Sequence, residues 1–138
     1  MIPVIAANRP HPYPPRVTEF TKTFWDALAE GRFITTASER TGQLTFPPKP
    51  IAPGSWDEDV KWVELSGRGI LYSHTTIHAS PAAFVDDLPY RICIVDLNEG
   101  LRIATRLIGD GEANIGGEVE IVAVRYDEHM SFAARHTS

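Results

Sequence analysis

The sequence predicts a mainly β protein that ends in a small closed barrel, and two observations lead to this prediction. The first is a repeat of period two in segments rich in Val, Ile and Thr, which is typical of β-strands. It recurs in six segments, residues 60–66, 69–78, 90–97, 101–109, 119–127 and 130–135. The second is that no helical pattern separates these segments, which argues against a parallel sheet. Five or six short strands in roughly 75 residues fit an OB-type barrel.

Turn signals and side-chain alternation support the barrel. Asn98, Glu99 and Gly100 predict a tight hairpin between the strands on either side. In residues 101–109, apolar and basic side chains alternate, so Arg102 and Arg106 are predicted to share the face opposite the core.

Residues 18–31 predict an amphipathic helix. Thr18 can cap its first turn, and Gly31 can end it. Large apolar side chains recur at helical spacing and form one stripe, which contains Phe20, Phe24, Ala27 and Leu28, with Trp25 beside it. Such a stripe either packs in the core or gives part of its face to another subunit. Phe24 and Trp25 are therefore candidates for contact with a partner.

The stretch between the helix and the barrel has the spacing of a zinc ribbon without its ligands. Cysteines at Ser38, Thr41, Ala52 and Ser55 would read C-x-x-C, ten residues, C-x-x-C, which is typical of a structural zinc site. Hydroxyls and a methyl group are not zinc ligands at ordinary affinity. We therefore expect no metal here and no cofactor, and we expect packing and the prolines of residues 46–53 to hold this lobe.

These patterns divide the chain into three parts. Residues 1–17 form a Pro-rich N-terminal arm, residues 18–59 the helix and the degenerate ribbon, and residues 60–138 the OB-fold barrel. The arm is either a frayed tail or a segment that lies along a partner, with Tyr13 and Val17 as apolar anchors.

Composition limits the function classes. The 138 residues have a formal net charge of −5, which argues against a nucleic-acid binder because such proteins usually present a basic face. One cysteine, Cys93, excludes a disulfide within the chain and fits a reducing cytoplasm. No window reaches the roughly 18 apolar residues of a membrane span, so we expect a cytoplasmic protein without a membrane partner.

The residues that could carry catalysis form no convincing constellation. Cys93 lies within an apolar strand, where a buried thiol is unreactive. His74 and His78 lie too far apart on a strand for one metal ion, and the neighbours Asp86 and Asp87 are typical of a solvated turn. The basic residues of the barrel half are solvated or form a phosphate patch for coenzyme A. They are Lys49, Lys61, Arg68, Arg91, Arg102 and Arg106.

Several short motifs follow one another in a specific order along nearly the whole chain. They are Phe24-Trp25 followed by Leu28 and Gly31, the ribbon frame with Gly42 and FPPKP, SGRG, Leu88-Pro89-Tyr90, ICIVDLNEG and NIGGEVEI. In the order and spacing of these motifs, the chain resembles the acyl-CoA-associated OB-fold family with an N-terminal helix and a rubredoxin-like zinc ribbon. Family members with four cysteines hold zinc in the ribbon. Because the four ligand positions carry other residues here, the resemblance implies a degenerate member that has lost its metal.

The resemblance implies an auxiliary subunit without catalytic residues of its own, in a complex with a thiolase-like or hot-dog-fold enzyme that processes acyl-CoA or a related acyl donor. Such a subunit bridges partner chains and shapes the acyl channel. The loop before the strand at 90–97 could contact the partner through Phe84, Leu88, Pro89 and Tyr90, or it could pack on its own barrel. The alternatives are a stand-alone acyl-CoA-binding module, with a coenzyme A thioester as ligand, and an OB-fold that binds single-stranded nucleic acid.

Overall fold

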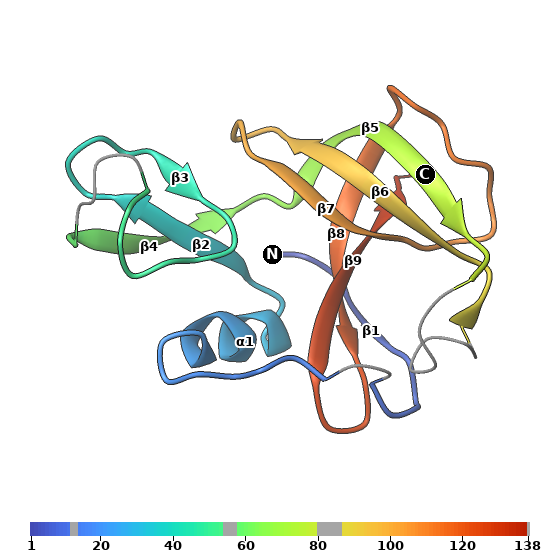
Figure 1. The fold of residues 1–138 in the computed structure, drawn as a ribbon, viewed down its shortest axis with the longest axis horizontal. Coiled ribbons are helices and arrows are strands. Elements are labelled where there is room, and N and C mark those ends of the chain that lie inside the picture. The colour runs from blue at the N-terminus through green and yellow to red at the C-terminus, as the bar shows by residue number, and fades with distance from the viewer. Residues whose placement is uncertain (12–13, 54–57, 80–86, 138) are drawn as a thin grey trace.

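The computed structural model describes residues 1–11, 14–53, 58–79 and 87–137, which form two lobes (Figure 1). These residues contain one helix, α1 (Lys22–Ala29). Their strands are β1 (Val4–Ala6), β2 (Phe33–Ser38), β3 (Leu44–Thr45), β4 (Val60–Leu65), β5 (Arg68–Ile77), β6 (Tyr90–Leu97), β7 (Arg102–Leu107), β8 (Glu118–Arg125) and β9 (Met130–His136). The described residues hold no helix long and apolar enough to cross a membrane.

The larger lobe is a closed five-stranded barrel with the strand order β8-β5-β6-β7-β9, and β9 pairs with β8 to close it. The β7–β9 pair is parallel and the other pairs around the barrel are antiparallel. The predicted hairpin is present between β6 and β7, where Gly100 has φ +96° and its N–H donates to the carbonyl of Leu97 at 2.9 Å. The mainly β fold and the OB-type barrel are therefore confirmed.

The smaller lobe consists of α1 and a three-stranded sheet with the order β3-β2-β4, and we call it the small lobe. One strand that the sequence predicted as part of the barrel, β4, belongs to this sheet. β4 pairs antiparallel with β2 along Phe33–Ser38 and not with the barrel, so the first barrel strand is β5. The alternation in β4 predicted a strand correctly but carried no information on its partner.

The first residues form an ordered segment, residues 2–11, which we call the N-terminal strap. β1 pairs in parallel with β8, and the N–H of Ile2 donates to the carbonyl of Gly31 at 2.7 Å. Ile2 is 6% exposed, and the N-terminus of the chain lies between the two lobes (Figure 1). Residues 2–11 of the arm therefore pack on their own chain and do not form a frayed tail. Tyr13 lies outside the described residues, and Val17 is exposed.

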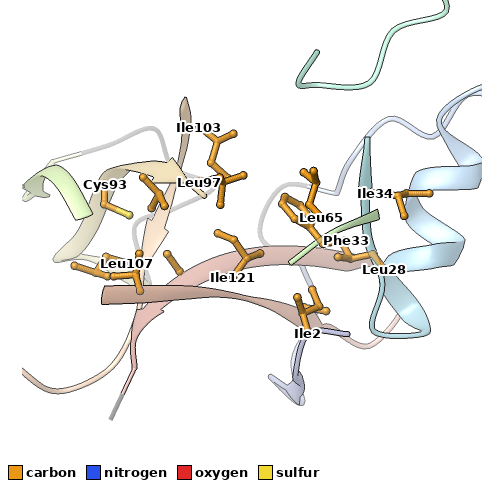
Figure 2. Close-up of a cluster of buried hydrophobic side chains, with 14 of the residues drawn as sticks. Ile2, Leu28, Phe33, Ile34, Leu65, Cys93, Leu97, Ile103, Leu107 and Ile121 are labelled. Atoms are coloured by element: carbon orange, nitrogen blue, oxygen red, sulfur yellow. The ribbon is translucent and has the colours of Figure 1, made fainter. Parts of the chain in front are cut away.

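One hydrophobic core runs through both lobes (Figure 2). Leu28, Phe33 and Leu65 of the small lobe join Leu97 and Ile121 of the barrel in a single cluster of buried side chains. Where the lobes meet, four phenylalanine rings lie with centroids 5.5 to 6.2 Å apart. They come from α1, β2, the segment after β3, and β9, as Phe24, Phe33, Phe46 and Phe132.

The helix ends close to its predicted limit but begins later than predicted, at Lys22, with Thr21 and not Thr18 at its N-cap. Thr18 and Thr21 exchange hydrogen bonds between each hydroxyl and the other residue's N–H, at 3.1 and 2.8 Å, so Thr18 fixes the turn that leads into α1. Gly31 adopts φ +81° directly after the helix, a conformation that favours glycine. Phe24, Ala27 and Leu28 are the buried residues of α1.

We predict that Gly69→Ala destabilises the chain by about 1–3 kcal/mol, because a Cβ at Gly69 would meet the backbone carbonyl of Asp96 across the β5–β6 pair. Gly111→Ala is the matched control, since a Cβ at Gly111 meets nothing within 4 Å. Urea unfolding of both variants measures the two changes. Equal stability of the two variants would contradict the close packing of β5 on β6.

Candidate functional site

The clearest candidate site is an open groove on the outside of the barrel, with a volume of about 440 Å³. The N-terminal strap, β7, β8 and β9 form its walls. Its lining residues are Ile5, Ala6, Ala7, Arg9, His11, Thr105, Arg106, Ile108, Val124, Tyr126, Ser131, Phe132 and Ala133. An apolar cleft with a few polar groups at its edge is the usual form of a small-molecule site.

The groove exists because β8 is apolar on both faces. Ile121 and Ala123 point into the barrel core, whereas Val122 and Val124 point outward and form a second buried cluster with Ala133. Ile5 and Ala7 of the strap and Ile108 after β7 pack around that cluster. β7 and β9 are paired at one position, Leu107 with Ala134, so the sheet offers a shallow opening beside this outer cluster.

Asp87 links the strap to the barrel at the rim of the groove. Its carboxylate accepts hydrogen bonds from Nη1 of Arg9 at 2.7 Å and from Nη1 of Arg106 at 2.9 Å, and the Asp87 side chain is 8% exposed. Burial raises the pKa of the Asp87 carboxyl, but the hydrogen bonds from Arg106 and Arg9 outweigh it, so the pKa lies below its ordinary value. We call this arrangement of three residues the Asp87 clamp.

Aromatic contacts continue the rim beyond the clamp. The ring of Tyr126 lies 4.5 Å from the ring of His11 and 5.4 Å from the guanidinium carbon of Arg9, centroid distances in both cases. Burial lowers the pKa of His11, and the charges of His129, Arg106 and Arg9 lower it further against the weaker opposite effect of Asp87. His11 is therefore mainly neutral at pH 7.

The predicted partner-facing loop ends at this rim. Leu88 and Tyr90 are half-buried and Pro89 is exposed, directly after the clamp residue Asp87. The guanidinium carbon of Arg106 lies 4.1 Å above the ring of Tyr90, so the same arginine holds both Asp87 and Tyr90. Phe84 lies outside the described residues.

The two candidates on α1 differ in exposure. Phe24 is 4% exposed and lies in the four-ring cluster, so this side chain packs in the core and presents no surface to a partner. Trp25 is half-buried, with its ring edge-on to Phe24 at 4.9 Å. Of the two roles that the sequence allowed, Phe24 has the core-packing role. Trp25 keeps exposed surface that a partner could contact.

The ribbon positions do not fit a zinc ion. Ser38 is 1% exposed, and its hydroxyl accepts the N–H of Thr41 at 3.2 Å, so a hydrogen bond stands where a metal bond would be needed. Ala52 is 4% exposed and carries only a methyl group. Ser55 lies outside the described residues. Within the described ranges, no group of three or more His, Cys, Asp or Glu side chains could hold a metal ion.

The structure gives none of the other candidate residues the surroundings of a catalytic group. Cys93 is 1% exposed, and burial raises its pKa to about 11 against the weaker effect of Arg91, so it stays a protonated thiol at neutral pH. Arg102 donates to Asp96 at 2.7 Å and lies 3.8 Å above the ring of Tyr72. Arg91 donates to the carbonyls of Gly109 and Gly111, while His74 and His78 are exposed.

Sequence reasoning missed Arg9, His11 and Tyr126, and it read Asp87 as a solvated turn. Arg9 and Asp87 are 78 positions apart, and only the folded chain brings them together. One signal was available: residues 121–124 are apolar without interruption, so both faces of that strand needed cover.

The chain is similar in sequence to a family of OB-fold proteins and to subunits of known enzymes. A family model for the C-terminal OB-fold domain of ChsH2 matches residues 62–124. The benzoylsuccinyl-CoA thiolase subunit BbsA of Thauera aromatica is 35% identical over 111 residues, which cover 78% of this chain and 76% of that subunit.

Two further proteins are similar. A DUF35 domain-containing scaffold protein of Methanocaldococcus jannaschii is 32% identical over 90 residues, 63% of this chain, and the chain covers 64% of that protein's length. A solved Ltp2-ChsH2(DUF35) aldolase contains a chain with a TM-score of 0.75 and 27% identity. The match covers 88% of this chain and 98% of that one.

We predict that Phe24→Ala lowers the free energy of unfolding by about 3–5 kcal/mol, because it opens a cavity among four packed rings. Trp25→Ala is the neighbouring control and should cost less, since the Trp25 side chain is partly exposed. Chemical denaturation of both variants gives the comparison. A larger loss for Trp25→Ala would contradict the placement of Phe24 in the core.

We predict that Asp87→Asn destabilises the chain by about 1–2 kcal/mol at pH 7, because the clamp loses two charge-assisted hydrogen bonds. The pKa of Asp87 is lower in the folded state than its ordinary 3.8. Its stabilisation is therefore full above that value and lost as the pH falls through the folded pKa. The stability difference between wild type and variant, measured by urea unfolding from pH 7 to pH 3, should shrink at the acid end.

Asp96→Asn is the control for the clamp, because Asp96 also pairs with an arginine but its side chain is 42% exposed. Its effect on stability at pH 7 should be smaller than that of Asp87→Asn. A pH-independent difference for Asp87→Asn, or equal effects of the two variants, would contradict a buried ionised clamp.

Proposed function

Because the chain belongs to the DUF35 family of OB-fold proteins, we propose that it is an auxiliary, non-catalytic subunit of a thiolase-like acyltransferase complex that acts on acyl-CoA or a related acyl donor. In this role it bridges subunits of the complex and shapes the acyl channel of the enzyme. The partner is a thiolase-like subunit, and a hot-dog-fold acyl-processing enzyme is the second partner class.

The observation that carries this proposal is the similarity to the BbsA subunit of benzoylsuccinyl-CoA thiolase. That similarity spans about three quarters of both chains, so it includes small-lobe as well as barrel residues. The resemblance to a chain of an Ltp2-ChsH2(DUF35) aldolase supports it with a second enzyme complex. A shared two-lobed body with different partner enzymes suits a protein that positions subunits.

The chemistry of this chain supports a division of labour. Thiolase-type acyl transfer needs an activated nucleophile, usually a cysteine with a lowered pKa. Cys93 has the opposite properties, because it is buried and its pKa is raised to about 11. We therefore assign the nucleophile and its base to the partner subunit.

The loop that ends with Leu88, Pro89 and Tyr90 is the surface we assign to the partner. Pro89 is exposed, and the half-buried Tyr90 is supported from one side by Arg106. Aromatic residues fixed in this way lose little entropy on binding and often carry much of the interface energy. The Asp87 clamp holds the start of this segment on the barrel.

Reconstitution tests the proposal. The chain is co-expressed with a thiolase-like protein of the same organism, the complex is purified, and acyl transfer is assayed with both proteins and with each alone. We expect a stable complex in which both proteins are needed for full activity. Acyl transfer by this chain alone, or full activity of the partner without it, would refute the proposal. Titration of the isolated chain with acetyl-CoA distinguishes the stand-alone acyl-CoA-binding alternative.

We predict that Tyr90→Ala weakens the complex by at least about 30-fold in Kd, the loss expected from an interface aromatic worth 2 kcal/mol. Tyr72→Ala is the control, because Tyr72 likewise lies beneath an arginine, Arg102, but outside the loop assigned to the partner. Surface plasmon resonance against the purified partner measures both. An unchanged Kd for Tyr90→Ala, with its fold intact, would exclude this loop from the interface.

A further inference from the structure

The groove between the N-terminal strap and β7–β9 has the form of a ligand site within this chain. Its floor is apolar: Val124 and Ala133 are 8% and 3% exposed, and Ile5, Ala7 and Ile108 pack beside them. Its volume of about 440 Å³ lies within the range of roughly 300–1,000 Å³ that is usual for small-molecule pockets. Because these side chains are apolar, the floor favours a hydrocarbon group of a ligand.

The rim has a different chemistry at one end. Two guanidinium groups, Arg9 and Arg106, pair with the carboxylate of Asp87. Arg9 uses one of its five N–H donors in its hydrogen bond to Asp87, and its side chain is 44% exposed. It can therefore donate to a second acceptor without breaking the clamp.

Aromatic contacts fix the polar side chains at this end. Tyr126 lies against both His11 and Arg9 and holds them at the edge of the groove. The guanidinium groups of Arg9 and Arg106 both line the groove here and would attract a negatively charged group placed beside them.

We propose that this groove binds a small apolar carboxylate, whose hydrocarbon part lies on Val124 and Ala133 and whose carboxylate pairs with Arg9 beside Arg106. Every residue of this site comes from this chain, so the site needs no residue of a partner. It goes beyond the proposed role as an auxiliary subunit, because it assigns to this subunit a ligand of its own, a free acid.

NMR titration of the full-length isolated chain with octanoate tests the site. We expect saturable shifts at the amides of Ala7, Val124 and Ala133. Octanamide is the matched ligand, since it has the same chain and a neutral head, and it should bind at least about tenfold more weakly, the equivalent of 1.4 kcal/mol. Equal binding of octanamide, shifts confined to other surfaces, or the absence of saturable shifts would each overturn the proposal.

Two variants separate the head and the tail of the ligand. Arg9→Gln should reduce octanoate affinity to that of octanamide, whereas Arg102→Gln, which alters an arginine outside the groove, should leave it unchanged. Ala7→Trp fills the groove from the strap and should abolish binding of both ligands. The amide spectrum of each variant reports its fold. Since every arm uses the isolated chain, failure here leaves the proposed association with an enzyme unaffected.

Discussion

The packing of four phenylalanine rings at the junction of the lobes is the contact on which the rest of the structure depends. Phe24, Phe33 and Phe46 come from three segments of the small lobe, and Phe132 comes from the last barrel strand. Each aromatic pair adds about 0.5–1.5 kcal/mol beyond the burial of its area. Phe24 and Phe33 belong to the same buried cluster as the barrel core, and Phe46 and Phe132 pack against it, so the small lobe has no separate interior that needs a metal to hold it.

Hydrogen bonds of three buried hydroxyl groups on β2 also hold the small lobe together. The Thr35 hydroxyl donates to the carbonyl of Thr45, the Thr36 hydroxyl accepts the N–H of Lys49, and the Ser38 hydroxyl accepts the N–H of Thr41. All three side chains are buried on β2, and their hydrogen bonds tie β2 to β3, to the segment after β3 and to the turn after β2. The frame of the ribbon thus persists because short polar side chains tie its loops to a buried strand, although its ligands are absent.

The local order of the chain could be predicted, and its long-range pairing could not. Alternation identified β4 to β9, and Gly31 and Gly100 identified the end of α1 and a hairpin, since these signals lie within a few residues. β4 was assigned to the wrong sheet because alternation does not name a partner strand. The groove escaped prediction because Arg9, Asp87 and Arg106 meet only after the strap has packed along β8. Function was within reach of the sequence at the level of the family, whereas the site depends on tertiary contacts.

Phe132 lies in β9, a wall of the barrel, and packs against the core that both lobes share. The strap, the clamp and the loop that ends at Tyr90 lie on this barrel. The proposed roles therefore depend on the two lobes forming one body. Scanning calorimetry with and without an excess of a zinc chelator tests this most directly. The account predicts one cooperative transition with the same midpoint in both conditions. A midpoint that falls with chelator, or a small lobe that melts before the barrel, would contradict it.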